Sequence, residues 1–376
     1  ILTSNIMDKS VKTTIALLSA VVIIGFLSGV VGELWVNSFL LPDPYLNFKN
    51  FSDLSRRIDE LVNGGQRSGL SDRDLLINEN IKKARPALVS VYRYKNFLGG
   101  QNINLLPSDL VGQAATITND GWILTSAEVA QFEKNIFWVE TNDHKLYKAV
   151  VKSINKTSSI AFLKIEANDL AVVEFSARNN LVNGQAVVIF SSGQEVINSS
   201  IKSLNYSDLT DYADFIHSSE TFYKFIVLQN QLSKNYFGAP VLTLDGKMAG
   251  LYSGASGLVI PVDHFIPAMK SAIKNEKLVK PYLGIKFYDL SEFLNDQNSE
   301  NRGVKIASSG VKADSPAKGF LFADDIILKV EGDELNVNNN LPELLSQYKA
   351  DQTIKLLVKR GSEEKTIDVK LASITN

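Results

Sequence analysis

Short runs of apolar residues, many of them alternating with polar ones, recur along residues 78–276 with turn signals between them. Strand-length runs spaced about 8–12 residues apart are typical of all-β sandwiches and barrels. From Leu75 onward we therefore expect β structure, closed by a helix over residues 263–273 with Asp263 as its N-cap. The predicted strands cover residues 87–94, 112–118, 122–125, 136–141, 147–154, 160–165, 186–191, 196–204, 225–229, 241–244, 248–252 and 257–260.

A different pattern precedes these runs, because residues 13–32 carry no charge. A helix of this length spans about 30 Å, the hydrocarbon thickness of a bilayer. Lys9 and Lys12 lie before the run and Glu33 lies after it. This charge pattern predicts a cytoplasmic tail over residues 1–12, a single transmembrane helix over residues 13–32, and a periplasmic or extracellular location for the bulk of the chain. A cleaved signal peptide and a buried core helix are the alternatives.

Residues 33–77 are the expected linker, or stalk. Within them, residues 51–62 have apolar positions at helical spacing, which predicts a short amphipathic helix. That helix suits a stalk, an oligomer contact or packing on its own domain. The glycines over residues 63–69 predict a flexible joint.

The composition changes after Pro281, where a separate unit of about ninety residues is expected to begin. Its pattern predicts strands and two short helices. The strands cover residues 283–287, 303–306, 325–330, 353–359 and 365–371, and the helices cover residues 315–318 and 341–349.

Charge and rare residue types limit the chemistry. The 376 residues carry a formal net charge of -2, which argues against a nucleic-acid binder, and 45% are hydrophobic, which supports real cores. The chain has no cysteine, so disulfides and thiolate chemistry are excluded. Its three histidines are His144, His217 and His264, each expected at the surface. Their spacing predicts no metal site, and no cofactor is expected.

Three segments of the chain contain recognisable sequence motifs. Residues 112–130 are GQAATITNDGWILTSAEVA, residues 156–165 are KTSSIAFLKI, and residues 234–250 are KNYFGAPVLTLDGKMAG. In this order they resemble the segments of the HtrA family of trypsin-like serine proteases that place the general-base histidine, the orienting aspartate and the nucleophilic serine. The resemblance implies a mainly β fold: a membrane-anchored trypsin-like double β-barrel over residues 78–276, followed by a PDZ domain over residues 281–373. It also implies a homotrimer.

The three triad positions are substituted. Glu128 stands at the histidine position, Ser159 at the aspartate position and Phe237 at the serine position. Triad catalysis needs a nucleophile, an imidazole base and an orienting carboxylate. We therefore expect no catalytic residue at these positions and a chain that is not an enzyme. The phenyl ring of Phe237 is expected to be largely buried, filling the space of the triad.

The PDZ-like part keeps its framework. Residues 281–285, PYLGI, resemble the stretch whose loop amides capture a peptide carboxylate, and residues 311–320 resemble the family's turn and helix. The resemblance implies that an extended peptide or protein C terminus pairs with this strand and packs on the helix beside it. The alternative is a PDZ fold that only packs on its neighbour. The expected peptide-binding residues are Tyr282, Leu283, Gly284, Ile285, Phe287, Leu341, Leu344 and Leu345.

We therefore expect a membrane-anchored HtrA-like pseudoprotease that binds peptides or partner proteins through its PDZ domain and acts as an adaptor, regulator or chaperone. Two alternatives stay open. One is an active serine-type endopeptidase with a non-standard site, for which Ser233, Ser253 and Ser256 lie near the loop of Phe237. The other is a structural subunit of a membrane protein complex.

Overall fold

The computed structural model describes residues 4–35, 72–95, 104–131, 135–190, 195–254, 256–274, 279–293 and 302–375. The chain divides into two units, Ile1–Leu70 and Ser71–Asn376. The stalk helix expected over residues 51–62 and the joint expected over residues 63–69 lie outside the described residues.

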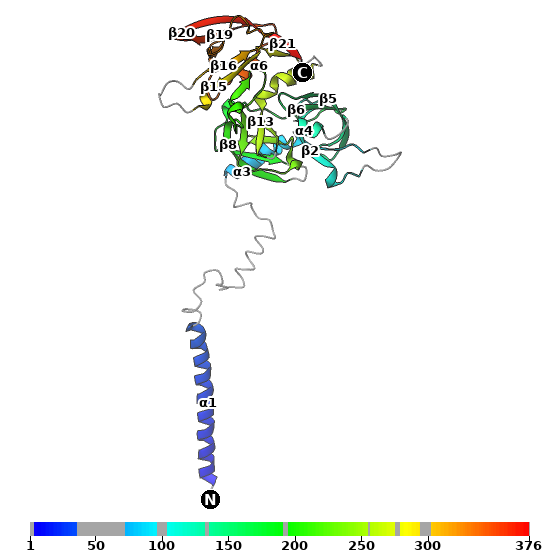
Figure 1. The fold of residues 1–376 in the computed structure, drawn as a ribbon. Coiled ribbons are helices and arrows are strands. Elements are labelled where there is room, and N and C mark those ends of the chain that lie inside the picture. Colours follow the sequence, from blue (N-terminus) through cyan, green and yellow to red (C-terminus); the bar gives the residue numbers. More distant parts are fainter. Residues whose placement is uncertain are drawn as a thin grey trace. The chain divides into compact units, whose positions relative to one another are not determined.

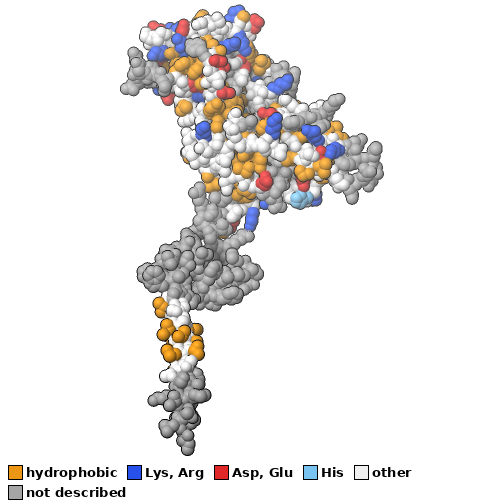
Figure 2. All heavy atoms as spheres, turned by 60° about the horizontal axis from the view of Figure 1, so that its bottom comes forward, with side chains coloured by type: hydrophobic (Ala, Val, Ile, Leu, Met, Phe, Trp, Pro, Cys, Tyr) orange, Lys and Arg blue, Asp and Glu red, His pale blue; other side chains and the backbone are white. Residues whose placement is uncertain are grey.

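The first unit contains the helix α1 (Ser4–Trp35). Figure 2 shows hydrophobic side chains gathered on its described part. Among the side chains that the structure describes, no helix has an apolar stretch long enough to cross a membrane. The exposed large apolar side chains of α1 are Leu17, Leu18, Val21, Val22, Ile23, Ile24, Phe26, Leu27 and Val31.

The second unit opens with the helix α3 (Asp72–Ala84), so the expectation of β structure from Leu75 onward is wrong for this segment. Ile81 and Ala84 lie one helical turn apart and are both buried against the barrel core. The amide of Asn80 also donates a hydrogen bond to the carbonyl of Leu244 at 3.3 Å. Tertiary packing of one helix face therefore decides the structure of this segment.

Two closed antiparallel barrels follow, as the resemblance to trypsin-like proteases implies (Figure 1). The first has the order β1-β2-β3-β6-β5-β4 and the second the order β10-β13-β12-β11-β7-β8. The strands of the first are β1 (Leu88–Arg93), β2 (Leu110–Thr116), β3 (Trp122–Ser126), β4 (Ile136–Glu140), β5 (Leu146–Asn155) and β6 (Ile160–Ile165). Those of the second are β7 (Ala186–Phe190), β8 (Val196–Tyr206), β10 (Phe225–Leu228), β11 (Pro240–Thr243), β12 (Met248–Tyr252) and β13 (Leu258–Pro261).

Alternation of side chains places the barrel core. In β4, Phe137 and Val139 are fully buried while their neighbours are partly exposed, as a period of two requires. One core cluster joins these residues of the first barrel to Ile189 and Tyr252 of the second. The two barrels therefore share apolar contacts, and Phe237 belongs to the same cluster.

The helix α5 (Ile266–Ile273) ends where the sequence predicts but begins later. Asp263 is not its N-cap, because a short 3-10 turn, Val262–His264, comes first and Phe265 holds the N-cap position. The carboxylate of Asp263 instead accepts a hydrogen bond from the backbone N–H of Arg178 at 2.9 Å.

The strands from residue 279 onward (Figure 1, yellow to red), together with β9 from the second barrel's part of the chain, form a seven-stranded sheet and a separate two-stranded sheet. The larger sheet has the order β20-β19-β17-β16-β15-β9, with β18 paired to β17. Its strands are β9 (Ile216–Ser218), β15 (Ile285–Asp289), β16 (Val304–Val311), β17 (Ile326–Val330), β18 (Asp333–Glu334), β19 (Thr353–Arg360) and β20 (Glu363–Lys370). The smaller sheet pairs β14 (Val279–Tyr282) with β21 (Ala372–Thr375).

One helix covers the core of this part, α6 (Leu341–Ser346). The carboxamide of Asn340 caps it by accepting a hydrogen bond from the N–H of Glu343 at 3.2 Å. The helix expected over residues 315–318 is wrong, because the chain there forms a series of turns. Ser315 stabilises them by donating its hydroxyl to the carbonyl of Lys312 at 2.7 Å.

Candidate functional site

Phe237 follows a single 3-10 turn, η6 (Lys234–Tyr236), and precedes β11. Its residue surface is 8% exposed and its ring centroid lies 6.4 Å from that of Tyr252. The expectation that Phe237 is largely buried is thus confirmed. Burying an aromatic side chain of this size contributes about 1.5–3 kcal/mol to stability. The position that the family motif gives to the nucleophile is a packing position in this chain.

The backbone around Phe237 fits closely against β2. The carbonyl of Phe237 accepts the N–H of Gln113 at 2.8 Å, and its N–H donates to the carbonyl of Lys234 at 3.0 Å. A Cβ on Gly112 would lie 2.5 Å from the Phe237 carbonyl oxygen, so only glycine fits there. The N–H of Phe237 is therefore used within the turn in this structure.

Glu128 lies in the single helical turn α4 (Ala127–Ala130), directly after β3. Its Oε1 accepts a hydrogen bond from the hydroxyl of Ser253 at 2.7 Å, and its Oε2 is buried with no hydrogen-bond partner among the residues that the structure describes. Ser253 follows β12 and is buried. A serine hydroxyl that donates to a carboxylate has the polarity needed for proton removal by a general base.

The other candidate serines lie apart from this pair. Ser233 and Ser256 are exposed. Ser159 has a φ of 51°, in the left-handed region that serine adopts rarely. Its carbonyl accepts the N–H of Ala127 at 2.8 Å, which ties the loop before β6 to the start of α4. Ser159 thus supports the segment that carries Glu128 through its backbone.

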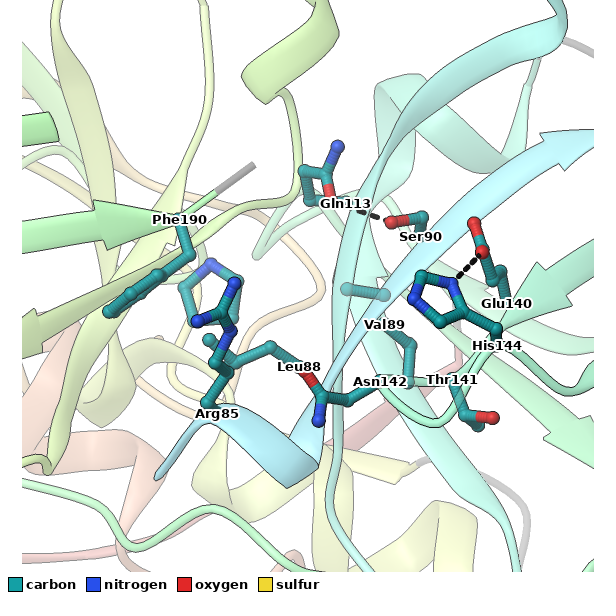
Figure 3. Close-up of a pocket in the computed structure, with 12 residues that line it drawn as sticks. Arg85, Leu88, Val89, Ser90, Gln113, Glu140, Thr141, Asn142, His144 and Phe190 are labelled. Atoms are coloured by element: carbon teal, nitrogen blue, oxygen red, sulfur yellow. Dashed lines mark hydrogen bonds and ion pairs between the residues drawn. The ribbon is translucent and has the colours of Figure 1, made fainter. Parts of the chain in front are cut away.

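All three histidines pair with glutamates. His144 Nδ1 lies 2.8 Å from Glu140, in a pocket of about 50 Å³ where Figure 3 shows this contact beside a hydrogen bond from Ser90 to Gln113. That volume suits one or two water molecules rather than a substrate.

Two of the histidines are not at the surface, contrary to the expectation. His217 and His264 are buried, and their Nε2 atoms lie 2.7 Å from Glu292 and 2.8 Å from Glu343, respectively. Buried polar rings need such partners, and sequence spacing gives no sign of them because both glutamates lie in the C-terminal part.

Six of the expected peptide-binding residues come together in the C-terminal core, whereas Tyr282 ends β14 and Gly284 lies in the loop before β15. β15 carries Ile285 and Phe287, both fully buried, and α6 carries Leu341, Leu344 and Leu345 in the same cluster. β16 pairs with one edge of β15, and β9 pairs with the other. The sequence pattern missed β9, which belongs to the loop between β8 and β10.

Buried ion pairs join this core to the barrels. Glu343 of α6 accepts hydrogen bonds from Arg178 and from His264. Burial raises the pKa of Glu343, but the hydrogen bond and charge of His264, together with the charge of Arg178, outweigh it and lower the pKa below its usual value. Burial likewise raises the pKa of Asp289. The ammonium group of Lys224 lies 2.6 Å from this carboxylate and outweighs the effect of burial, so the pKa of Asp289 is lowered.

Two family models match the two parts of the second unit. Residues 112–251 match the trypsin-like peptidase domain, and residues 281–371 match the PDZ domain. The chain therefore carries a trypsin-like peptidase domain followed by a PDZ domain. The solved structures of similar fold include "HtrA-type protease AlgW with decapeptide", with a TM-score of 0.58 and 18% identity over 80% of this chain and 99% of that chain. The mainly β, trypsin-like fold with a PDZ domain is thus confirmed.

Curated relatives match most of the length of this chain. A "Probable periplasmic serine endoprotease DegP-like" of Marinomonas sp. (strain MWYL1) is 28% identical over 302 residues, covering 75% of this chain and 62% of that protein. A relative of the same name from Pseudomonas fulva (strain 12-X) is 25% identical over 277 residues, covering 70% of this chain and 56% of that protein. The chain therefore spans about 60% of the length of these relatives.

These names contradict the expectation that the chain is not an enzyme. The relatives are named serine endoproteases, and the fold matches that of HtrA-type proteases. Substitution at Glu128, Ser159 and Phe237 does not by itself establish inactivity. The motif positions also do not reveal that Ser253 reaches Glu128, because the two residues are 125 positions apart and meet only in the folded chain.

Proposed function

We propose that this HtrA-like chain is a serine-type endopeptidase that binds polypeptides through its PDZ domain and cleaves them at Ser253, with Glu128 as the general base. The observation that carries the proposal is the 2.7 Å hydrogen bond from the Ser253 hydroxyl to Glu128. The names of the curated relatives support the reaction class. The match of residues 281–371 to the PDZ family supports peptide binding.

In the proposed reaction Ser253 Oγ attacks the scissile carbonyl carbon while its proton passes to Glu128 Oε1. Collapse of the tetrahedral intermediate breaks the C–N bond, and the proton of Glu128 passes to the leaving amine. Water then attacks the acyl-serine ester and again gives a proton to Glu128. The bond between the acyl carbon and Ser253 Oγ breaks, Glu128 returns the proton to Ser253 Oγ, and the carboxylic product leaves. The buried Oε2 of Glu128 has no partner in the described part of the chain, so this carboxylate can accept a further hydrogen bond in the course of the reaction.

The oxyanion of the intermediate needs backbone donors. In the structure the N–H of Phe237 donates to the carbonyl of Lys234 within the turn η6. The proposed reaction therefore includes opening of this turn, which frees the N–H to face the substrate carbonyl. Such rearrangements on substrate binding are common in loops that complete catalytic sites.

Ser253→Ala is expected to abolish cleavage of an unfolded protein such as reduced casein by the full chain. Glu128→Gln is expected to lower the rate about 100-fold or more, because general-base catalysis is worth roughly 10²–10⁴-fold. A fluorophosphonate should label Ser253, identified by peptide mapping. The control is Ser256→Ala, an exposed serine three positions away that should leave cleavage unchanged. Absence of cleavage and labelling in the unmodified chain, or cleavage retained by Ser253→Ala, contradicts the proposal.

We also propose that the chain works outside the cytoplasm, held at the membrane by α1. Support comes from the periplasmic names of the relatives and from the exposed apolar side chains of α1, among them Val21, Ile24 and Phe26. On fractionation of cells that express it, the full chain is expected in the membrane pellet, and protease added to spheroplasts should digest the PDZ domain. Recovery in the soluble fraction, or protection from the added protease, contradicts this. The homotrimer stays a prediction.

A further inference from the structure

β15, the strand expected to pair with a peptide, has a strand of the chain itself on its outer edge. β9 runs antiparallel to it, with Ser218 opposite Lys286 and His217 opposite Phe287. A peptide that adds to a sheet edge makes main-chain hydrogen bonds of this kind. β9 therefore takes the position that an added peptide would take.

The residues just after β9 place a carboxylate on the loop that precedes β15. The N–H of Gly284 donates to Glu220 Oε1 at 2.9 Å, and the N–H of Ile285 donates to Ser219 Oγ at 3.0 Å. Lys312 donates to Glu220 Oε2 at 3.2 Å. The carboxylate of Glu220 is thus held by one backbone amide and one ammonium group, which are donors of the kind that capture the C terminus of a peptide.

Gly284 shapes this loop. Its φ is 80°, and a Cβ there would lie 2.3 Å from the Cβ of Ser315. Glycine therefore lets the chain turn so that the two successive N–H groups of Gly284 and Ile285 face the segment that follows β9. The same loop is the part of the PDZ framework that the sequence resemblance identifies as carboxylate-binding.

Side chains on both sides of Glu220 hold the segment in place. The hydroxyl of Tyr223 donates to Asp289 at 2.8 Å, and its ring is buried in the C-terminal core cluster. The ring of His217 stacks on that of Tyr223 with centroids 3.8 Å apart, and its Nε2 lies 2.7 Å from Glu292. The contact is therefore built from a strand, a carboxylate and two aromatic side chains.

We infer that residues 216–220 are an internal ligand of the PDZ domain, in which the side-chain carboxylate of Glu220 takes the place of a terminal carboxylate. The inference rests on the proposed binding of polypeptides by this domain and adds how that binding is controlled. A polypeptide that ends in a free carboxylate must displace both β9 and Glu220. Because a tethered ligand acts at a high effective concentration, the internal segment weakens the apparent affinity for every external C terminus.

Hydrogen exchange on the full chain tests the internal contact without any ligand. In the unmodified protein the amides of β15 are expected to be protected. Glu220→Ala and His217→Pro are each expected to speed their exchange at least tenfold, because the first removes the carboxylate and the second removes an N–H from β9. Glu220→Gln keeps a hydrogen-bond acceptor for the N–H of Gly284. Its β15 amides should therefore exchange at rates between those of the unmodified protein and those of Glu220→Ala. Glu364→Ala, an exposed glutamate of β20, is the matched control and should change nothing.

Peptide binding tests the role of the contact. The probes are a library of fluorescein-labelled peptides with free C termini and the same library amidated. Glu220→Ala is expected to bind free-acid peptides at least tenfold more tightly than the unmodified chain, with no gain for the amidated set. Fast exchange of β15 in the unmodified chain, or equal affinity of the two proteins for free-acid peptides, overturns the internal ligand but leaves PDZ binding standing. No binding by any variant, although β15 has opened, overturns the proposed PDZ function itself.

Discussion

Gly238→Ala is expected to destabilise the barrels by about 3 kcal/mol, the sum of two costs. Gly238 has a φ of 75°, where an alanine is strained by about 1 kcal/mol. Its Cβ would also lie 2.2 Å from both the carbonyl oxygen of Gln113 and the hydroxyl of Thr125. Those two groups are hydrogen-bonded to each other at 2.7 Å, so neither moves freely. Forcing extra volume into a packed site costs about 1–3 kcal/mol.

Urea unfolding measures this effect through the fluorescence of Trp122 and Trp138, which lie on β3 and β4 of the first barrel. The matched control is Gly361→Ala. Gly361 also has a positive φ, 63°, but a Cβ there meets nothing within 4 Å, so only the strain of about 1 kcal/mol is expected. If the two substitutions cost the same free energy of unfolding, the close approach at Gly238 does not exist in solution.

Lys224→Met is expected to destabilise the C-terminal part by about 3–5 kcal/mol, the cost of leaving a buried charge without its partner. The ammonium of Lys224 is 1% exposed and lies 2.6 Å from the carboxylate of Asp289. It also donates to the hydroxyl of Ser291 at 3.2 Å and to the carbonyl of Val337 at 3.3 Å. Methionine matches the length of lysine but satisfies none of these groups.

Urea unfolding followed by circular dichroism measures this change. Lys355→Met is the control. Lys355 forms an ion pair with Asp368, and both side chains are more than half exposed. Exposed ion pairs of this kind contribute about 0–1 kcal/mol to stability. Adding Asp289→Asn to Lys224→Met should recover part of the loss, since it removes the stranded charge. A loss no larger than that of the control would show that the Lys224–Asp289 pair is open to water.

The barrel strands can be predicted from the sequence because each of them has a local hydrophobic pattern of its own. β4 alternates buried and exposed positions, and turn residues separate it from its neighbours. β9 offers no such signal, since three residues between loops have no periodicity of their own. It is a strand only because β15, about seventy residues further along, offers it an edge. α3 was missed for a related reason: the burial of Ile81 and Ala84 against the barrels selects the helix.

The candidate site likewise contains one feature that the sequence predicts and two contacts that it does not. The burial of Phe237 follows from the sequence, because an apolar ring at a position that the family motif places inside the fold is expected to pack in the core. The partnership of Ser253 with Glu128 and that of Glu220 with Gly284 do not follow from the sequence, since each joins residues far apart in the chain. Hydrogen bonds between side chains of distant segments depend on the finished fold, and no local pattern encodes them.

β9 also changes where the chain can be cut. The composition marks a boundary near residue 281, but a fragment that begins there lacks the outermost strand of its larger sheet. It lacks the ring of Tyr223 from its core as well, and it exposes the main-chain groups along β15. An open sheet edge is a template for pairing with other chains. A C-terminal fragment whose sheet edge and core are both covered must therefore include the loop between β8 and β10, which carries β9 and Tyr223. A boundary placed near residue 281 from the sequence would separate this loop from the sheet that it completes.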